Sequence, residues 1–489
     1  MTPTIIIVIL TVYFGTLMLI SYITGRKADT NAFFTANRQS PWYLVAFGMI
    51  GTSLSGLTFI SVPGQVINSG FSYYQVILGH IIGYIVIAQV LMPLYYRLNL
   101  ISIYTYLRDR LGPYSYFTGA AFFILSRTLG SAMRLYLAAS VLHIFLFGPM
   151  QVPFWVTAII TLVLIWLYTY KGGVKTIVWT DSFQTIFLIS SVIICTIIII
   201  NKLDLSTDVL LSSLNETGFS TMFQFADINA KNHFLKHFFG GAFIAIAMTG
   251  LDQDLMQKNL TCKNIGEAKK NMYSFTTILV IVNLLFLILG ALLYIYAAQF
   301  SVPLPLNDNG KIITDNVFPK LALSEFGLVA GIFFLLGIIA SSFASADSAL
   351  TALTTSFCID FLPFQKYNEK QRNKAKNWVH IGFSAVFFII ILVANEFADQ
   401  ALIDLILKLA GYTYGPLLGL FAFGILFKYQ IKDKLVPIVC LASPIVCFIL
   451  DSNSIKWFGG YQFGFEILIL NGALTLAGLL FLSTKKQVQ

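Results

Sequence analysis

The polar residues best suited to chemistry in this 489-residue chain lie inside long apolar segments. One segment carries Ser341, Ser345 and Ser348 at positions i, i+4 and i+7, so a helix there would present three hydroxyl groups on one face. Hydroxyl oxygens suit a weakly held monovalent cation, although a seam of small residues that lets helices pack closely explains the same spacing. Asp347 beside them favours the cation site, because a carboxylate in apolar surroundings needs a functional partner.

Three further ionisable residues lie in neighbouring apolar segments. Asp181 has no basic residue beside it in the sequence, so it needs Na+, a proton or a positive side chain as its partner, unless it only favours the start of its helix. Arg127 and Arg134 are seven residues apart and share one helix face. Either guanidinium group could clamp a substrate carboxylate. Pairing with Asp181 or Asp347, or reaching toward the membrane surface, is the structural alternative.

The segment over residues 47–64 is a poor continuous helix. It contains four glycines, five Ser or Thr residues and Pro63, which weaken helical hydrogen bonding. Broken backbone at membrane depth is tolerated where it is buried in protein or lines a cavity, and its freed carbonyl groups can hold a cation. The segment 238–253 shows a weaker version of this pattern. Two such breaks indicate a transporter's binding site, whereas close packing of small residues is the alternative.

The elements that must hold these residues are membrane spans. Hydrophobic residues make up 57% of the chain and charged residues 11%, and the mean hydropathy is +0.79. A soluble domain carries about 25% charged residues, so the composition excludes a soluble protein, and no polar interval is long enough for a second domain. We expect a single polytopic membrane domain over residues 1–489, whose first apolar run is a retained helix and not a signal peptide.

A transmembrane helix needs about 20 predominantly apolar residues. The sequence predicts thirteen spans, near residues 3–23, 42–67, 74–96, 116–147, 153–169, 177–200, 237–252, 273–298, 327–357, 378–396, 403–427, 435–450 and 463–483. Of the 31 Lys and Arg residues, 22 lie in one set of alternating loops, 6 in the other and 3 inside spans. Because basic loops stay in the cytoplasm, the N-terminus is predicted outside and the C-terminus inside. The net charge of +9 therefore reflects topology and predicts no nucleic-acid partner.

Other classes of protein find less support in the sequence. No HExxH or GxSxG motif points to an enzyme, and the five cysteines have no CxxC spacing for a zinc site. A channel would need a continuous polar pore, whereas the polar residues here cluster near the middle of the spans. A channel or a membrane sensor nevertheless stays open as an alternative to a transporter.

Three motifs carry a resemblance to a known family. They are Gly172-Gly173 followed by Val178-Trp179-Thr180-Asp181 and Gln184, the stretch Gln253-Asp254-x-x-Gln257-Lys258, and the hydroxyl-rich ninth span running into Ile359-Asp360. With these motifs the chain resembles the sodium:solute symporter family over nearly its whole length. The resemblance implies an all-α polytopic LeuT-like fold with a five-plus-five inverted repeat. Its parts would be a lead helix at 3–23, repeats at 42–200 and 237–427, and two trailing helices at 435–483.

The resemblance also implies where Na+ binds. The main sodium site would comprise Gly51, Leu54, Ser341, Ala344 and Ser345. A second site, for Na+ or a proton, would comprise Asp181, Asp347 and Ser348 together with Ala344. Ala344 stands where many relatives carry a serine, and Asp347 stands where they usually carry a hydroxyl. Two carboxylates that share a site favour either a firmly held second Na+ or a shared proton.

Residues 52–63 look most like the sialic acid carriers of this family. The residues expected around the solute are Ser53, Ser55, Thr58, Tyr73, Gln75, Arg127 and Arg134. Sugar carriers place an acidic residue at the position of Leu57, which disfavours a glucose or galactose carrier. The carboxylate-binding arginine of sialic acid carriers aligns with Gly130, one helical turn from each of the two arginines.

We therefore expect sodium-coupled symport of a small polar organic solute into the cytoplasm by alternating access. The solute would be a sialic acid, a sugar or another organic anion, and a monocarboxylate, vitamin or amino acid is the alternative. The expected partners are Na+, the solute and the lipid bilayer, and the carrier would work as a monomer in a cell inner membrane.

Overall fold

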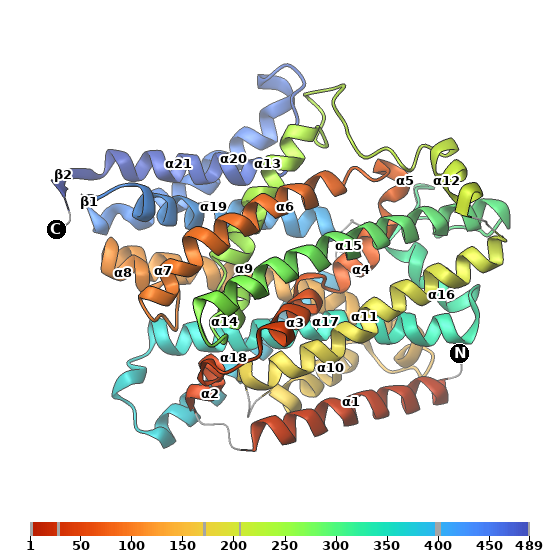
Figure 1. Ribbon diagram of the computed structural model, residues 1–489, viewed down its shortest axis with the longest axis horizontal. Helices are drawn as coiled ribbons and strands as arrows, with labels where there is room; N and C mark the ends of the chain where they lie inside the picture. Colours follow the sequence, from red (N-terminus) through yellow and green to blue (C-terminus); the bar gives the residue numbers. More distant parts are fainter. Residues whose placement is uncertain (1–2, 27–29, 170–172, 205–206, 397–401, 488–489) are drawn as a thin grey trace.

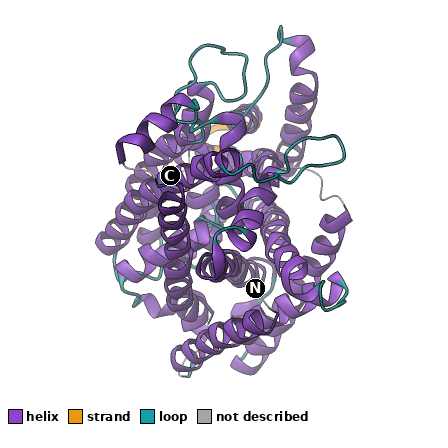
Figure 2. Cartoon of the chain, turned by 90° about the vertical axis from the view of Figure 1, so that its right-hand side faces the viewer, coloured by secondary structure: helices purple, strands orange, loops and turns teal. Residues whose placement is uncertain are grey.

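The computed structural model describes residues 3–26, 30–169, 173–204, 207–396 and 402–487. Lys27, Lys171 and Gly172, which the sequence assigns to inner loops and to a family motif, lie outside these ranges. The described chain is helical apart from its loops and one small sheet, and most long helices run along the longest axis of the molecule (Figure 1). A view along that axis shows many of them end-on (Figure 2).

The first half of the bundle runs from the lead helix to α12, which lies in the connection between the two halves. Its helices are α1 (Pro3–Gly25), α2 (Thr30–Thr35), α3 (Trp42–Ser53), α4 (Gly56–Gly64), α5 (Val66–Ser69), α6 (Tyr74–Val86), α7 (Met92–Arg97), α8 (Thr105–Arg110), α9 (Pro113–Leu142), α10 (Phe154–Thr169), α11 (Gly173–Leu203) and α12 (Thr207–Glu216). A π-helical segment, Ile87–Leu91, joins α6 to α7.

The second half has a corresponding series of helices and two more at its end. They are α13 (Phe234–Ala245), α14 (Gln253–Asn259), α15 (Ile265–Gln299), α16 (Val317–Ser324), α17 (Gly327–Ser356), α18 (Glu369–Glu396), α19 (Leu402–Leu426), α20 (Val436–Trp457) and α21 (Ile467–Phe481). A π-helical segment, Ile246–Gly250, extends α13. The strands β1 (Tyr429–Ile431) and β2 (Ser483–Gln487) pair antiparallel.

Eight helices in the described ranges are long and apolar enough to cross a membrane, or up to ten spans if each of two bent pairs counts as one. Three more helices coincide with the remaining predicted spans. Of these, α10 and α21 have only 16 and 15 residues, and α9 carries Arg127 and Arg134. The chain is thus an α-helical polytopic membrane protein, and the number of thirteen spans stays a prediction.

Both predicted breaks are confirmed. The axes of α3 and α4 differ by 58°, and the axis of α13 with its π-helical extension differs from that of α14 by 70°. At the first break Leu54 and Ser55 leave helical geometry. Gly56 lies so close to α17 that a Cβ atom there would be 1.9 Å from Ser342 Oγ. The glycine therefore allows a backbone approach that a larger residue would prevent.

Several helices begin before their apolar runs. The sequence predicts a span from 273, yet α15 starts at Ile265 because the side chain of Asn264 caps it and accepts a hydrogen bond of 2.9 Å from the Glu267 amide. Similarly, α18 starts at Glu369 and not near 378. Polar residues continue these helices beyond the apolar run, so hydropathy alone underestimates their length.

The helix α17 lies at the centre of the bundle. Every residue from Phe334 to Ser356 is buried, and the helix packs chiefly on α11 and α9. Outer helices instead expose large apolar side chains, such as Val12 on α1 and Ile438 on α20, which are 65% and 63% exposed. Apolar surfaces of this kind suit contact with lipid. The hydroxyl-rich helix is therefore the one held farthest from the bilayer.

Candidate functional site

The break between α3 and α4 meets α17 at Gly51. A Cβ atom at Gly51 would lie 2.6 Å from Thr185 Oγ1 and 3.6 Å from the Ala344 side chain. The Gly51 amide donates a 3.1 Å hydrogen bond to Thr185 Oγ1, whose hydroxyl donates to the Asp181 carbonyl at 2.7 Å. The structure thus brings together Gly51 and Ala344, which the sequence assigned to one sodium site.

The other residues of the predicted main site differ in what they offer. Leu54 stands at the break itself, where its amide still donates to Ile50 O at 2.8 Å. The Ser341 hydroxyl donates to Ile338 O within its own helix at 3.0 Å. The Ser345 hydroxyl is buried and has no hydrogen-bond partner among the described residues. An orphaned oxygen of this kind is what a bound cation would use.

Asp181 has a positive side chain as its partner. Lys258, in the last turn of α14, contacts Asp181 Oδ2 and Thr52 Oγ1 with its ammonium group. Thr52 in turn donates to Asp181 Oδ2 at 2.9 Å. Lys258 is one of the 22 basic residues that the hydropathy pattern assigns to inner loops, but it lies within α14 and its side chain is only 2% exposed. Its length lets it reach from the end of α14 into the core.

Asp347 faces the same region from α17. Tyr168 donates a 2.8 Å hydrogen bond to Asp347 Oδ2. Asp347 Oδ1 and Asp181 Oδ1 are both buried and have no partner in the described part of the chain. The Ser345 hydroxyl, two residues from Asp347 and so on another face of α17, is a third buried oxygen without a partner among the described residues, and oxygens of this kind suit a hard monovalent cation.

Ser348 does not face that region as predicted. Its hydroxyl donates to Asp254 Oδ1, and Arg127 contacts the other oxygen of the same carboxylate. Arg127 also lies 3.8 Å from Asp252 Oδ2, which accepts a hydrogen bond from Tyr414. The assignment of Ser348 to a cation site stays a prediction, and in this structure its hydroxyl donates to Asp254 instead of pairing with Asp181 or Asp347. Arg127 has acidic partners, but they are neither of the two acids considered from the sequence.

Asp254 and Lys258 stand in a motif that carries the family resemblance, but the sequence pattern predicts no role in the site for them or for Asp252. Asp252 lies at the weak break of the seventh span, and Asp254 and Lys258 follow it on α14. The Asp252 side chain caps α14 by accepting a 2.8 Å hydrogen bond from the Asp254 amide. Charged residues within a few positions of a broken span were the available signal, since such breaks lie in the protein interior.

A small cavity of about 90 Å³ lies beside the first break. It is lined by six of the seven residues expected around the solute, namely Ser53, Ser55, Thr58, Tyr73, Arg127 and Arg134. Gln75 is the exception. Its side chain donates to Asn232 O at 3.0 Å and accepts from the Gln224 amide at 3.0 Å, so it anchors the loop before α13. We therefore remove Gln75 from the candidate solute contacts.

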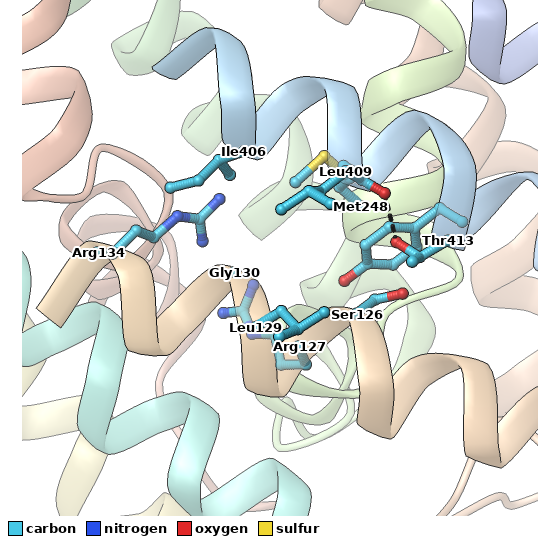
Figure 3. Close-up of a pocket in the computed structure, with 11 residues that line it drawn as sticks. Ser126, Arg127, Leu129, Gly130, Arg134, Met248, Ile406, Leu409 and Thr413 are labelled. Carbon is cyan, nitrogen blue, oxygen red and sulfur yellow. Dashed lines mark hydrogen bonds between the residues drawn. The ribbon is translucent and has the colours of Figure 1, made fainter. Parts of the chain in front are cut away.

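The two arginines differ in their surroundings. Both project from α9 toward α19, with Gly130 between them (Figure 3). Arg127 is paired with acids, whereas Arg134 Nε has no hydrogen-bond partner and Arg134 forms no ion pair within the described residues. A Cβ atom at Gly130 would meet nothing within 4 Å. Among the described residues, Arg134 is therefore the cationic group of this cavity without an ion pair, although Asp252 interacts with it electrostatically.

A larger cavity of about 290 Å³ lies at the end of the bundle predicted to face outward. Tyr73 lines both cavities and separates them. Lys408 at its rim is 2.7 Å from Asp451 Oδ2. The same carboxylate accepts a 2.6 Å hydrogen bond from Tyr412. The two cavities therefore share Tyr73 in their linings.

Two bent helices, one from each half of the bundle, meet beside buried polar cavities. This arrangement is typical of membrane transporters. Residues 33–431 match the sequence pattern of the Sodium:solute symporter family, and the chain belongs to this family. The fold is also that of a solved Na+-coupled sialic acid symporter in a substrate-bound outward-open state. The TM-score is 0.82 at 19% identity, and 98% of each chain is covered.

Two curated relatives show how far the sequence similarity extends. The sodium/sialic acid symporter NanT of Aliivibrio fischeri is 24% identical over 474 residues, which cover 95% of this chain and 91% of NanT. The sodium-coupled monocarboxylate transporter 1 of Xenopus laevis is 25% identical, with 84% of this chain and 65% of the relative covered. Both relatives are transporters named for acidic solutes.

Proposed function

We propose that this sodium-coupled symporter carries a small organic anion into the cytoplasm and that Arg134 binds the carboxylate of the solute. The observation that carries the proposal is the unpaired Arg134 guanidinium at a cavity lined by Ser53, Ser55 and Thr58. Arg134 is partly buried, and a guanidinium group that is partly removed from water without an ion pair is unfavourable. A solute carboxylate would remove that cost and match the planar group with two parallel hydrogen bonds.

Arg127 is the weaker candidate for this role. Its charge is already neutralised by Asp254 and lies near Asp252. A solute carboxylate at Arg127 would have to compete with two ion-paired acids, whereas at Arg134 it would meet only the longer-range field of Asp252. We therefore assign Arg127 to the structure that holds α9 against α14, and Arg134 to the solute.

Sialic acids and monocarboxylates are the first solutes to test, because relatives named for both are similar to this chain along most of its length. Arg134 favours an acid over a neutral sugar. The absence of an acidic residue at Leu57 points the same way, since the resemblance implies one there in sugar carriers.

Sodium would bind where the broken backbone meets α17. The groups proposed for it are the carbonyl groups at Gly51, Leu54 and Ala344 and the hydroxyl groups of Ser341 and Ser345. Asp181 and Asp347 lie next to these groups and would supply negative charge. External Na+ would tie the first break to α17 and favour the conformation that binds solute, so that low internal Na+ releases both.

The proposed topology has thirteen spans in a cell inner (plasma) membrane. Its N-terminus lies outside and its C-terminus lies in the cytoplasm. The bias of Lys and Arg between alternating loops supports it. In addition, α1 begins at the right of Figure 1, whereas β2 lies at the left, at the opposite end of the bundle. Two inverted repeats over 42–200 and 237–427 would account for the matched bends.

A thermal-shift screen of the purified protein tests the assignment of the solute. N-acetylneuraminic acid, lactate, proline and galactose would each be added in Na+ or in K+ medium. We expect an acid to raise the unfolding temperature only with Na+, and the shift to vanish in Arg134→Gln. Arg108→Gln, which changes an exposed arginine, should keep the shift. A shift with galactose alone, or one unchanged in Arg134→Gln, would contradict the proposal.

A further inference from the structure

His80 on α6 differs from the other histidines of the chain, because both of its ring nitrogens are buried without a hydrogen-bond partner in the described residues. The other four each have at least one partner, namely His143 with Thr157, His233 with the Leu235 amide, His237 with Ser72 O and His380 with Thr354. A neutral imidazole carries one donor and one acceptor, and leaving both unpaired away from water is unfavourable. The position therefore calls for a ligand or a water molecule.

The imidazole of His80 lines the inner cavity of about 90 Å³, which Arg134 and Ser53 also line. Its ring centroid lies 5.8 Å from that of Tyr84, one helical turn further along α6. The same cavity thus has a guanidinium group from α9 and an unpaired imidazole from α6. A solute that fills this cavity would be in reach of polar groups from two different helices besides the first break.

Two glycines fix the position of α6 and hence of His80. Gly79 and Gly83 lie where α6 packs on α13, and Cβ atoms there would overlap Phe238 O and Ala242 O. The backbones of the two helices therefore approach each other more closely than larger residues would allow. Close packing of this kind restricts rotation of α6, so the imidazole stays at the cavity.

We propose that His80 hydrogen-bonds a second polar group of the solute, so that the carrier selects acids with a hydroxyl, oxo or amide group besides the carboxylate over plain alkanoates. Arg134 would bind the carboxylate, and the imidazole would donate to an oxygen or accept from a hydroxyl group. A site built to hydrogen-bond a solute group rejects an analogue that lacks it, because the buried polar atoms of the site then stay unpaired. The inference rests on the proposed function, since it narrows the class of acid bound at that site.

The test compares acids with and without a second polar group. Affinities of N-acetylneuraminic acid, lactate, pyruvate and propionate are measured from the concentration dependence of the thermal shift of the purified full-length protein in Na+ medium. Propionate is the matched analogue of lactate without the hydroxyl group. We expect the acid that binds most tightly to carry a hydroxyl, oxo or amide group, and propionate to bind more weakly than it. His80→Phe should weaken binding of that acid by roughly 2–10-fold.

Two further variants control for effects on the fold. His80→Phe keeps an aromatic ring beside Tyr84, whereas His80→Gln keeps a donor and an acceptor and should retain more of the affinity. His143→Phe is the matched control, because His143 already lies 3.3 Å from its partner Thr157 Oγ1. This variant should leave the affinity for each acid unchanged.

The ranking of acids by the wild type decides the inference even if no variant can be purified. Propionate binding as tightly as the best substituted acid overturns it. An unchanged affinity for the tightest acid in a folded His80→Phe overturns it as well, and would mean that water is the partner of the imidazole. A thermal shift with none of the acids would instead contradict the proposed function, so the two failures are distinguishable.

Discussion

The guanidinium group of Arg127 on α9 contacts the carboxylate of Asp254 on α14, although 127 residues separate them in the chain. Both side chains are buried, at 4% and 1% exposed. The pair joins the first half of the bundle to the bend in the second. Removing one partner of such a pair leaves an uncompensated charge inside the protein.

We therefore expect Arg127→Gln to destabilise the fold by about 3–5 kcal/mol, as seen when buried ion pairs are broken. Denaturant unfolding of the purified protein in detergent measures this change. The control is Arg108→Gln, because Arg108 and its partner Asp109 are 51% and 58% exposed and such pairs contribute about 0–1 kcal/mol. Equal unfolding curves for the two variants would show that the buried pair has no structural role.

Gly51 lies on α3 just before the first break. It is one of the residues of the predicted sodium site, and it lies beside Ala344 of α17. In Gly51→Ala the new Cβ atom would meet Thr185 Oγ1 at 2.6 Å, so that α3 or the Thr185 side chain must shift at the position that lies beside Ala344. We expect loss of Na+ binding, measured by 22Na+ scintillation proximity, while the protein remains folded by size-exclusion chromatography. Gly15→Ala on α1 is the matched control, since its Cβ atom would meet nothing within 4 Å. Retained Na+ affinity in Gly51→Ala would remove this position from the sodium site.

Much of this arrangement could be predicted from local sequence. The glycines and hydroxyl residues around Leu54 and Ser55 predicted the break, because they weaken a helix wherever they occur. The spacing of the serines in the ninth span correctly placed Ser345 in the buried core beside Asp347. These features depend on residues near one another in the chain.

The partners of the buried charges could not be predicted in the same way. Asp181 and Lys258 are 77 residues apart, and their contact depends on how α14 packs against α11. Lys258 follows an apolar run, so hydropathy placed it in a loop. Ser348 had the expected helical spacing, but its hydroxyl direction was determined by Asp254 on another helix. Long-range packing, and not local pattern, made these choices.

Ala344 is the α17 residue of the predicted main sodium site that lacks a side-chain oxygen. In Ala344→Ser a hydroxyl would be added beside Gly51. If the added hydroxyl contributes to Na+ binding as much as a typical hydrogen bond, about 0.5–1.5 kcal/mol, the Na+ affinity increases roughly 2–10-fold. The half-saturating Na+ concentration in 22Na+ binding should fall by this factor, whereas Ser345→Ala should raise it. A weaker affinity in Ala344→Ser would mean that α17 contributes no side-chain ligand at this position.

Asp347 supplies the negative charge that Lys258 leaves unbalanced. Asp347→Ser restores the hydroxyl that the resemblance implies for most relatives, and it should weaken Na+ binding by more than about tenfold. A charge pair about 4 Å apart at an effective dielectric constant of about 20 is worth about 4 kcal/mol, well above the 1.4 kcal/mol of a tenfold change. Tyr168→Phe removes only the hydrogen bond to Asp347 and should have a smaller effect. Unchanged Na+ affinity in Asp347→Ser would place the ion elsewhere.

Uptake into proteoliposomes is the most direct measurement of sodium-coupled transport of an organic anion through Arg134. Radiolabelled N-acetylneuraminic acid and lactate are offered under an inward Na+ gradient or with K+ in place of Na+. The account predicts saturable accumulation of one of these acids above equilibrium, only with the Na+ gradient, and loss of that accumulation in Arg134→Gln. Flux that neither saturates nor depends on Na+, or equal accumulation by Arg134→Gln, would contradict it.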